Sequence, residues 1–150
     1  MPVDVQLASD LCDLPEIGDI QKWADVTLDE LGEDAEPPDL CIRLVGTAES
    51  RTLNYQYRGT DKPTNVLSFA ADVEVPGARV LGDLVICAPV VLSEAQSQEK
   101  SSTDHFAHMV VHGVLHLLGH DHELPEAASQ MERLELRVLT RLGVPDPYEQ

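Results

Sequence analysis

Histidine is confined to one short stretch of this chain of 150 residues. All six histidines lie between residues 105 and 122, and the densest segment is HGVLHLLGHDH over residues 112–122. Within it, His112, His116 and His122 have the spacing H-x3-H-x5-H. Residues four apart lie on one face of a helix, so His112 and His116 can direct ring nitrogens at a single point. The segment therefore predicts a helix that carries a polar centre on an otherwise apolar surface.

The glycine that follows this helix allows the third histidine to join the first two. Gly119 can adopt a left-handed conformation, which ends a helix and turns the chain, so His122 could return to the same point. Three neutral imidazoles with an open fourth position are typical of a catalytic zinc site, and zinc lowers the pKa of bound water to about 7. We therefore predict one Zn2+ per chain, bound by His112, His116 and His122, although imidazole also suits other divalent metals. The alternatives are a purely structural zinc site and helix histidines that bind no metal.

The same spacing occurs in the metzincin protease pattern H-E-x-x-H-x-x-G-x-x-H. In this chain Gly113 occupies the position of the protease glutamate. That glutamate is the general base of peptide hydrolysis, and glycine cannot accept a proton. The sequence therefore keeps the pattern of metal ligands but disfavours a metalloprotease.

The remaining sequence is typical of one globular domain. Hydrophobic residues make up 43% and charged residues 25% of the chain, and its length suits a single domain over residues 1–150. The sequence shows no signal peptide and no apolar run of about 20 residues. The cysteines are three and scattered, without a CxxC pair. We therefore expect a cytoplasmic protein with no membrane partner.

Hydrophobic periodicity predicts strands mixed with helices along the chain. The predicted strands are Val3–Leu7, Leu40–Val45, Val66–Phe69 and Val80–Ala88. The predicted helices are Leu14–Leu31, Thr47–Tyr57, Pro89–Gln98, Thr103–Leu118 and Pro125–Leu142. This order indicates an α/β or α+β domain.

The charge of the chain is strongly acidic but unevenly distributed. The sequence has 27 acidic and 10 basic residues, a net charge of −17 with histidine neutral. Such a chain should not bind nucleic acid non-specifically. Segment 43–62 is the exception, because it holds four basic residues against two acidic ones: Arg43, Arg51, Arg58 and Lys62 against Glu49 and Asp61. We predict that this segment forms a local basic patch.

Three blocks of the sequence together resemble the YbeY family of bacterial endoribonucleases, which mature ribosomal RNA. The blocks are HGVLHLLGHDH at 112–122, LNYQYRGTDKPTNVLSF at 53–69 and LGDLVI at 81–86. The resemblance implies a single-domain, metzincin-like α/β fold with a small mixed sheet of four to five strands and flanking helices. It also implies that His112, His116 and His122 bind the zinc and that Arg58 is a catalytic or RNA-contacting residue.

The function that the resemblance implies is zinc-dependent, single-strand-specific cleavage of RNA. Its setting would be 3′-end maturation of small-subunit rRNA and ribosome quality control, with single-stranded RNA or rRNA as substrate. Ribosomes or small-subunit ribosomal proteins are the expected partners, and DNA is not. Arginine and zinc can both stabilise charge that develops on phosphoryl oxygens. The nucleophile could be zinc-bound hydroxide or the 2′-hydroxyl of the RNA.

The high acidity favours one alternative from another functional class. A protein with a net charge of −17 is suited to docking on basic ribosomal proteins, so the chain could be mainly a ribosome-assembly factor with a structural metal. Two residues near the ligands have open roles. Asp121 could orient a ligand, act as a proton shuttle or cap the turn, and His108 could support a ligand, face the substrate or pack in the core. We expect His105 and His120 to be exposed.

Overall fold

The computed structural model describes residues 3–8, 14–31, 39–71, 80–120 and 124–148. The elements in chain order are β1 (Val3–Ala8), α1 (Ile17–Leu31), β2 (Asp39–Val45), α2 (Thr47–Arg58), β3 (Val66–Ala70), β4 (Val80–Cys87), α3 (Ala88–Ser97), α4 (Ser102–Leu117) and α5 (Pro125–Leu142). Every predicted strand and helix is present, with boundaries within three residues of those expected. The predicted mixture of strands and helices is therefore confirmed.

The four strands form one mixed sheet in the order β1-β2-β4-β3. Strands β1, β2 and β4 are parallel, whereas β3 runs antiparallel to β4. Helix α1 links β1 to β2, which is the crossover that adjacent parallel strands require. The small mixed sheet is therefore as predicted.

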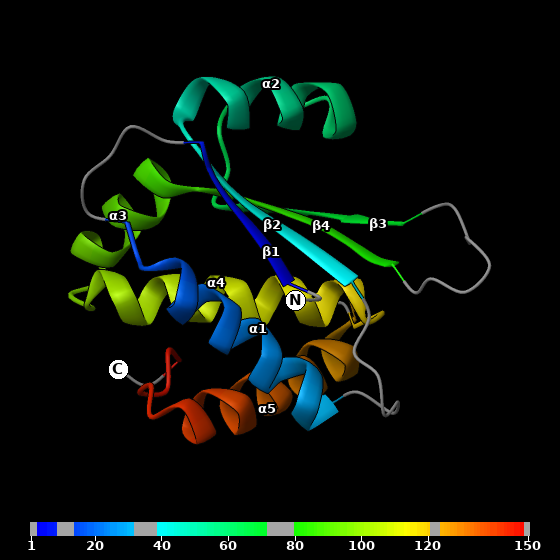
Figure 1. Cartoon of the computed structure of the whole chain (residues 1–150), viewed down its shortest axis with the longest axis vertical. Helices are drawn as coiled ribbons and strands as arrows, with labels where there is room; N and C mark the ends of the chain where they lie inside the picture. The colour runs from blue at the N-terminus through cyan, green and yellow to red at the C-terminus, as the bar shows by residue number, and fades with distance from the viewer. Residues whose placement is uncertain (1–2, 9–13, 32–38, 72–79, 121–123, 149–150) are drawn as a thin grey trace.

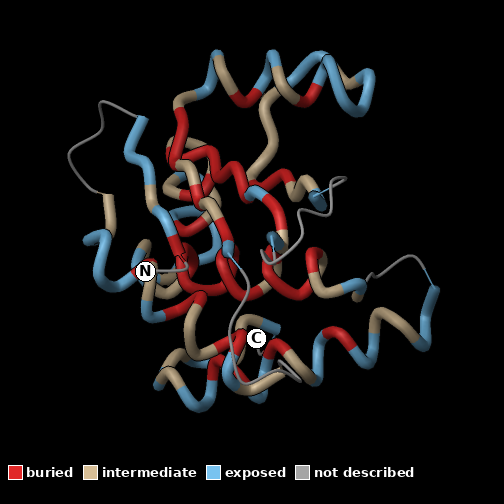
Figure 2. Tube along the Cα trace, turned by 45° about the vertical axis from the view of Figure 1, so that its right-hand side comes forward, coloured by how far each residue is buried: buried red, intermediate tan, exposed pale blue. Residues whose placement is uncertain are grey.

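The helices cover the two faces of the sheet unequally. Helix α2 lies alone over one face, and α1 and α4 pack on the other, with α5 beyond them (Figure 1). The largest core cluster lies between the sheet and α1 and α4, and it includes Trp23, Ile42, Leu84 and Phe106. Buried residues accordingly concentrate in the central strands and in α4 (Figure 2). In the part of the chain that the structure describes, no helix is both long and apolar enough to cross a membrane.

Helix α4 lies close to β4 at Gly113. A Cβ atom at this position would lie 2.6 Å from Cδ2 of Leu84, a side chain that is fully buried. Only a hydrogen atom fits there without moving Leu84, so glycine lets the helix approach the strand closely. The residue that replaces the protease glutamate thus also has a packing role.

We expect Gly113→Ala to lower the free energy of unfolding by about 1–3 kcal/mol, the usual effect of overpacking a core. Alanine favours a helix over glycine by about 1 kcal/mol, so a loss would show that the contact with Leu84 dominates. Chemical denaturation measures the change. Gly18→Ala in α1 is the matched control, because no atom lies within 4 Å of its added Cβ. Equal stability of the two variants would contradict the packing role.

Candidate metal centre

Helix α4 presents four of its histidines on one side. The helix begins after Ser101, whose side chain accepts a hydrogen bond of 3.0 Å from the backbone N–H of Asp104. This bond satisfies one of the free donors of the first turn. Residues 105, 108, 112 and 116 then follow at intervals of three or four, which places them along one side. Apolar side chains hold the other sides of α4 in the core.

The Nε2 atoms of His112 and His116 approach each other, with the ring planes edge to face at 77°. Their Nε2 atoms are 3.1 Å apart, and their ring centroids are 4.6 Å apart. Two nitrogens bound to one tetrahedral zinc ion at 2.0–2.1 Å are about 3.3 Å apart. The pair therefore fits a shared metal ion, with Nε2 of each ring as the ligand atom.

Helix α4 ends in the turn that the glycine predicts. Gly119 has φ +99°, and its N–H donates to the carbonyl of His116 at 3.0 Å. The N–H of His120 donates to the carbonyl of Leu115, also at 3.0 Å. Together these two bonds form a Schellman motif, which reverses the chain after the helix. The third predicted ligand, His122, and Asp121 lie outside the described residues.

A buried carboxylate that the sequence analysis missed lies behind His112. Glu135 of α5 is only 1% exposed, and its Oε1 accepts a hydrogen bond of 3.0 Å from Nδ1 of His112. Its Oε2 contacts Nε2 of His108 and accepts a hydrogen bond of 2.9 Å from the Tyr148 hydroxyl. One sequence signal could have identified it, because Glu135 lies on the stripe of α5 that also carries buried Met131, Val138 and Leu139.

The surroundings of Glu135 keep it ionised. Burial raises the pKa of its carboxyl, but the hydrogen bonds from His108 and His112 act in the other direction, and the pKa is lowered to about 2. The pKa of Tyr148 is raised by burial and by the adjacent Glu135 charge, so its hydroxyl stays protonated and donates. His108 is itself buried, and its Nε2 contacts the same carboxylate, so this ring both packs in the core and contacts the cluster.

The structure therefore offers two donor sets that share His112. One is the pair of Nε2 atoms on His112 and His116. The other comprises His108, His112 and Glu135, whose ligand atoms all lie within 4.8 Å of one another. The second set agrees with the expectation that a metal can bind here, but only one of its three members is a predicted ligand.

The expectation for His105 is wrong. His105 was expected to be exposed, but it is buried, with only 3% of its surface exposed. Its Nε2 lies 3.0 Å from Oε1 of Glu94 in α3. Glu94 also accepts a hydrogen bond from the side-chain amide of Asn65. The packing of α3 against α4 buries this ring, and spacing along α4 alone does not reveal a neighbouring helix. His120, in contrast, is partly exposed.

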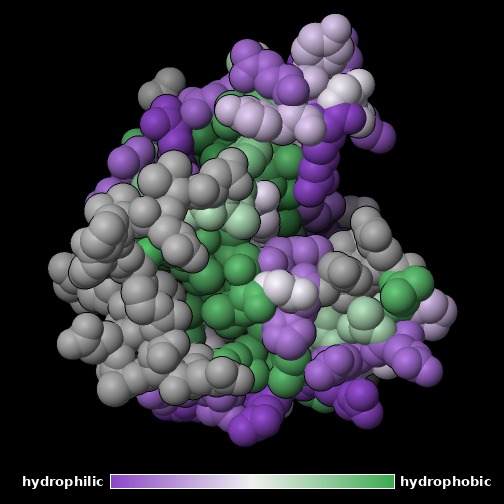
Figure 3. Space-filling model, turned by 90° about the vertical axis from the view of Figure 1, so that its right-hand side faces the viewer, coloured by the Kyte–Doolittle hydropathy of each residue, from purple (hydrophilic) through white to green (hydrophobic). Residues whose placement is uncertain are grey.

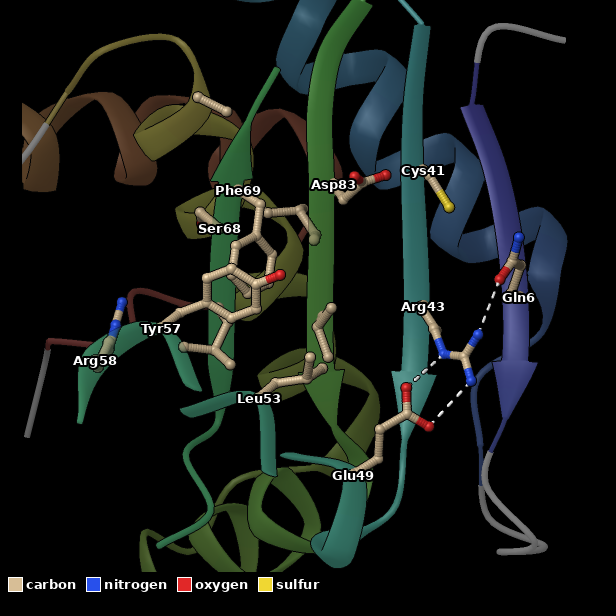
Figure 4. A pocket seen from close by; sticks show the side chains of 14 residues that line it. Gln6, Cys41, Arg43, Glu49, Leu53, Tyr57, Arg58, Ser68, Phe69 and Asp83 are labelled. Atoms are coloured by element: carbon tan, nitrogen blue, oxygen red, sulfur yellow. Dashed lines mark hydrogen bonds and ion pairs between the residues drawn. The ribbon is translucent and has the colours of Figure 1, made fainter. Parts of the chain in front are cut away.

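Arg58 lies at the end of α2, on the other face of the sheet from α4. It is exposed, and it borders a cavity of about 850 Å³ whose lining includes Tyr57, Ser68 and Phe69 (Figure 4). From another side of the molecule, apolar surface is visible below the hydrophilic side chains of α2 (Figure 3). The Ser68 hydroxyl donates to the carbonyl of Gly113 at 3.5 Å, so one cavity wall contacts α4 beside His112. No contact joins Arg58 to the described histidines.

The predicted basic patch is partly neutralised by its own acidic residues. Arg43 forms an ion pair of 2.8 Å with Glu49 (Figure 4), and Arg51 forms a bidentate pair with Asp61 at 2.7 and 3.0 Å. Among the described residues, the exposed Arg58 and Lys62 form no ion pair of this kind. The positive charge of segment 43–62 is therefore most available at the C-terminal end of α2 and in the loop that follows it.

We expect His105 to make stability depend on pH. Burial lowers the pKa of its ring, although Glu94 acts in the other direction. The unfolded chain takes up a proton near pH 6.5, whereas the folded chain resists it. The contribution is therefore present above about pH 6.5 and is lost as the pH falls below that value.

Urea unfolding of the wild type and His105→Gln between pH 5 and 8 measures this contribution. The difference in unfolding free energy between the two proteins should shrink as the pH falls. A difference that stays constant over this range would contradict the assignment of a neutral, buried ring.

Three comparisons with known proteins show what this chain is similar to. A family model described as "Endoribonuclease YbeY" matches residues 13–143. A protein named endoribonuclease YbeY from Halorhodospira halophila is 52% identical over 141 residues, which cover 91% of this chain and 89% of that protein. Another of the same name from Coxiella burnetii (strain Dugway 5J108-111) is 45% identical over 150 residues, covering 99% and 98%.

The fold is also found in a solved structure. The solution structure of TM1509 from Thermotoga maritima matches with a TM-score of 0.54 and 21% identity, covering 97% of this chain and 96% of that one. At this identity the likeness concerns the fold alone. The family match and the identities over most of the chain, in contrast, settle its descent: this chain belongs to the endoribonuclease YbeY family.

Proposed function

We propose that this chain is a metal-dependent endoribonuclease that cleaves single-stranded RNA during the maturation of small-subunit rRNA. The observation that carries the proposal is the facing pair of Nε2 atoms on His112 and His116, in a chain whose relatives are named endoribonucleases. In this proposal the metal is one Zn2+ per chain, with His122 as its third ligand. The enzyme acts in the cytoplasm, where ribosomes are assembled.

Different residues of the chain would bind the metal ion and the RNA phosphate during phosphodiester cleavage. His112 and His116 would hold the ion, and Arg58 would bind a phosphate oxygen of the RNA with its guanidinium group. A divalent ion bound there supplies a Lewis acid for the negative charge of the transition state. Tyr57 and Phe69 pack edge to face with ring centroids 4.8 Å apart, and they give the cavity beside Arg58 an aromatic wall.

Peptide cleavage is less compatible with this site. Gly113 lacks a base, and its close contact with Leu84 leaves no room for a glutamate side chain without movement of the core. Both the missing base and the lack of space at Gly113 therefore disfavour peptide hydrolysis.

The acidity of the chain favours a second candidate function, in which it acts mainly as a ribosome-assembly factor. A net charge of −17 opposes binding to free RNA but suits contact with basic ribosomal proteins. The two functions predict different results for a folded protein without its metal, so the first experiment below distinguishes them.

We expect His116→Ala to lose both zinc and RNA cleavage, because it removes one of two facing ligand atoms. Elemental analysis gives the metal content, and a labelled single-stranded RNA gives the cleavage rate. His105→Gln is the matched control, since it alters a histidine of the same helix that is bonded to Glu94 instead.

Chelation of the wild type should abolish cleavage, and zinc should restore it. If His116→Ala still folds and supports rRNA maturation in cells that lack the wild-type protein, the assembly-factor function replaces the nuclease. Cleavage of RNA by metal-free protein would also contradict the proposal.

We expect Arg58→Ala to slow RNA cleavage by about 10²–10³-fold, the usual effect of removing one donor to transition-state charge. Its zinc content should be unchanged, because Arg58 does not contact the described histidines. Arg51→Ala removes the same charge seven positions earlier on α2 but breaks an exposed pair with Asp61, so its rate should remain near that of the wild type. Equal rates for the two variants would exclude a specific role for Arg58.

A further inference from the structure

Glu135 is a carboxylate at a buried position of α5, where an apolar side chain would be expected. It is 1% exposed on the stripe of α5 that faces the core, next to Met131 and Val138. Transfer of a carboxylate out of water is highly unfavourable unless it is paired and hydrogen-bonded. An apolar side chain would fill the same position without that penalty, so the contacts of the carboxylate indicate its role.

The first contact determines the chemistry of His112. A carboxylate can only accept, so Nδ1 of His112 carries the hydrogen of the 3.0 Å bond to Oε1 of Glu135. The lone pair of the neutral ring is then on Nε2, the atom that lies 3.1 Å from Nε2 of His116. The bond to Glu135 therefore selects the tautomer that presents a ligand atom toward His116.

The second oxygen of Glu135 is held from two other directions. Its Oε2 accepts from the Tyr148 hydroxyl at 2.9 Å and contacts Nε2 of His108. Nδ1 of His108 is buried and has no hydrogen-bond partner among the described residues, so this ring fits the neutral form with its hydrogen on Nε2. Three donors from α4 and the C-terminal segment thus fix the orientation of one negative charge.

We propose that Glu135, clamped by His108 and Tyr148, is a positioning residue that fixes the ring and tautomer of His112 for metal binding. This inference rests on the proposed function only in treating His112 as a metal ligand. Carboxylates that accept a hydrogen bond from a ligand histidine raise its basicity, and their loss typically weakens metal binding 10–100-fold. The sequence places this carboxylate 23 residues beyond the ligand that it orients.

The competing assignment is that His108, His112 and Glu135 bind a cation themselves, since their ligand atoms lie within 4.8 Å of one another. A cavity of about 280 Å³ borders His112, Glu135 and Tyr148. In that arrangement Nδ1 of His112 would have to lose its hydrogen to bind the cation. The two assignments differ in metal stoichiometry, which makes them separable.

The test measures zinc affinity by competition with a chromophoric chelator, without RNA. Glu135→Gln should bind one zinc per chain 10–100-fold more weakly than the wild type. Glu126→Gln is the matched control, because it removes the same charge from an exposed position nine residues earlier on α5, outside the lining of this cavity, and its affinity should be unchanged. Tyr148→Phe removes only one hydroxyl and should weaken binding in the same direction by a smaller factor, even if Glu135→Gln does not fold.

A second measurement reports the tautomer itself in metal-free protein. Nitrogen NMR near pH 8, where an ordinary imidazole is neutral, should show His112 with its hydrogen on Nδ1. Glu135→Gln should convert the ring to a mixture of tautomers, and Glu126→Gln should not. This readout would not change if Glu135 only contributed to packing.

Three results would overturn the proposal: unchanged zinc affinity in both Glu135→Gln and Tyr148→Phe, an unchanged tautomer of His112 in Glu135→Gln, or two zinc ions per wild-type chain that fall to one in Glu135→Gln. Failure of the nuclease function has a different signature. In that case the wild type would leave single-stranded RNA intact while the differences in affinity and tautomer persist, and the positioning role would stand.

Discussion

The burial of helix α4 is the constraint on which the rest of the structure depends. This helix packs on the sheet and against α1, α3 and α5, and at Gly113 it approaches β4 so closely that a Cβ would meet Leu84. Polar side chains on a helix enclosed in this way are removed from water and require partners. Glu94 and Glu135 supply them from α3 and α5. Carboxylates therefore hold the buried His105 and His108 within the core, and Glu135 also bonds to His112, which is only partly buried.

Charged side chains on the other face of the sheet are in contact with water, unlike the buried polar groups of α4. There three basic residues of segment 43–62 are exposed and Arg43 is partly buried, and Arg43 and Arg51 pair with acidic neighbours. A chain with a net charge of −17 repels polyanions over most of its surface, so recognition of RNA in the proposed function depends on a few local contacts. Arg58 and the aromatic wall beside it offer such contacts, and docking on basic proteins would supply affinity that the overall charge denies.

Features that depend on neighbouring residues in the chain were predictable. The apolar periodicity of α4 and α5 places them within one residue of their observed bounds, because each stripe must face the core. The turn at Gly119 follows from a single residue that tolerates positive φ. The facing of His112 and His116 follows from helical spacing alone. The exposure expected for His105 was wrong because its environment is built by α3, which no local pattern of α4 describes.

The sequence by itself determined the order of strands and helices, the mixed α/β class and the pairing of two candidate ligands, since these arise from periodicities within single elements. Only the tertiary structure decided that Glu135 and Tyr148 lie behind His112, because they come from segments 23 and 36 residues further along the chain. It also decided that Arg43 and Arg51 are neutralised by Glu49 and Asp61. The contacts of Glu135 and Tyr148 depend on how α5 and the C-terminal segment pack against α4, which no short stretch of sequence reveals. The pairs of Arg43 and Arg51 join residues 6 and 10 positions apart, and they depend on the path of the chain between neighbouring elements.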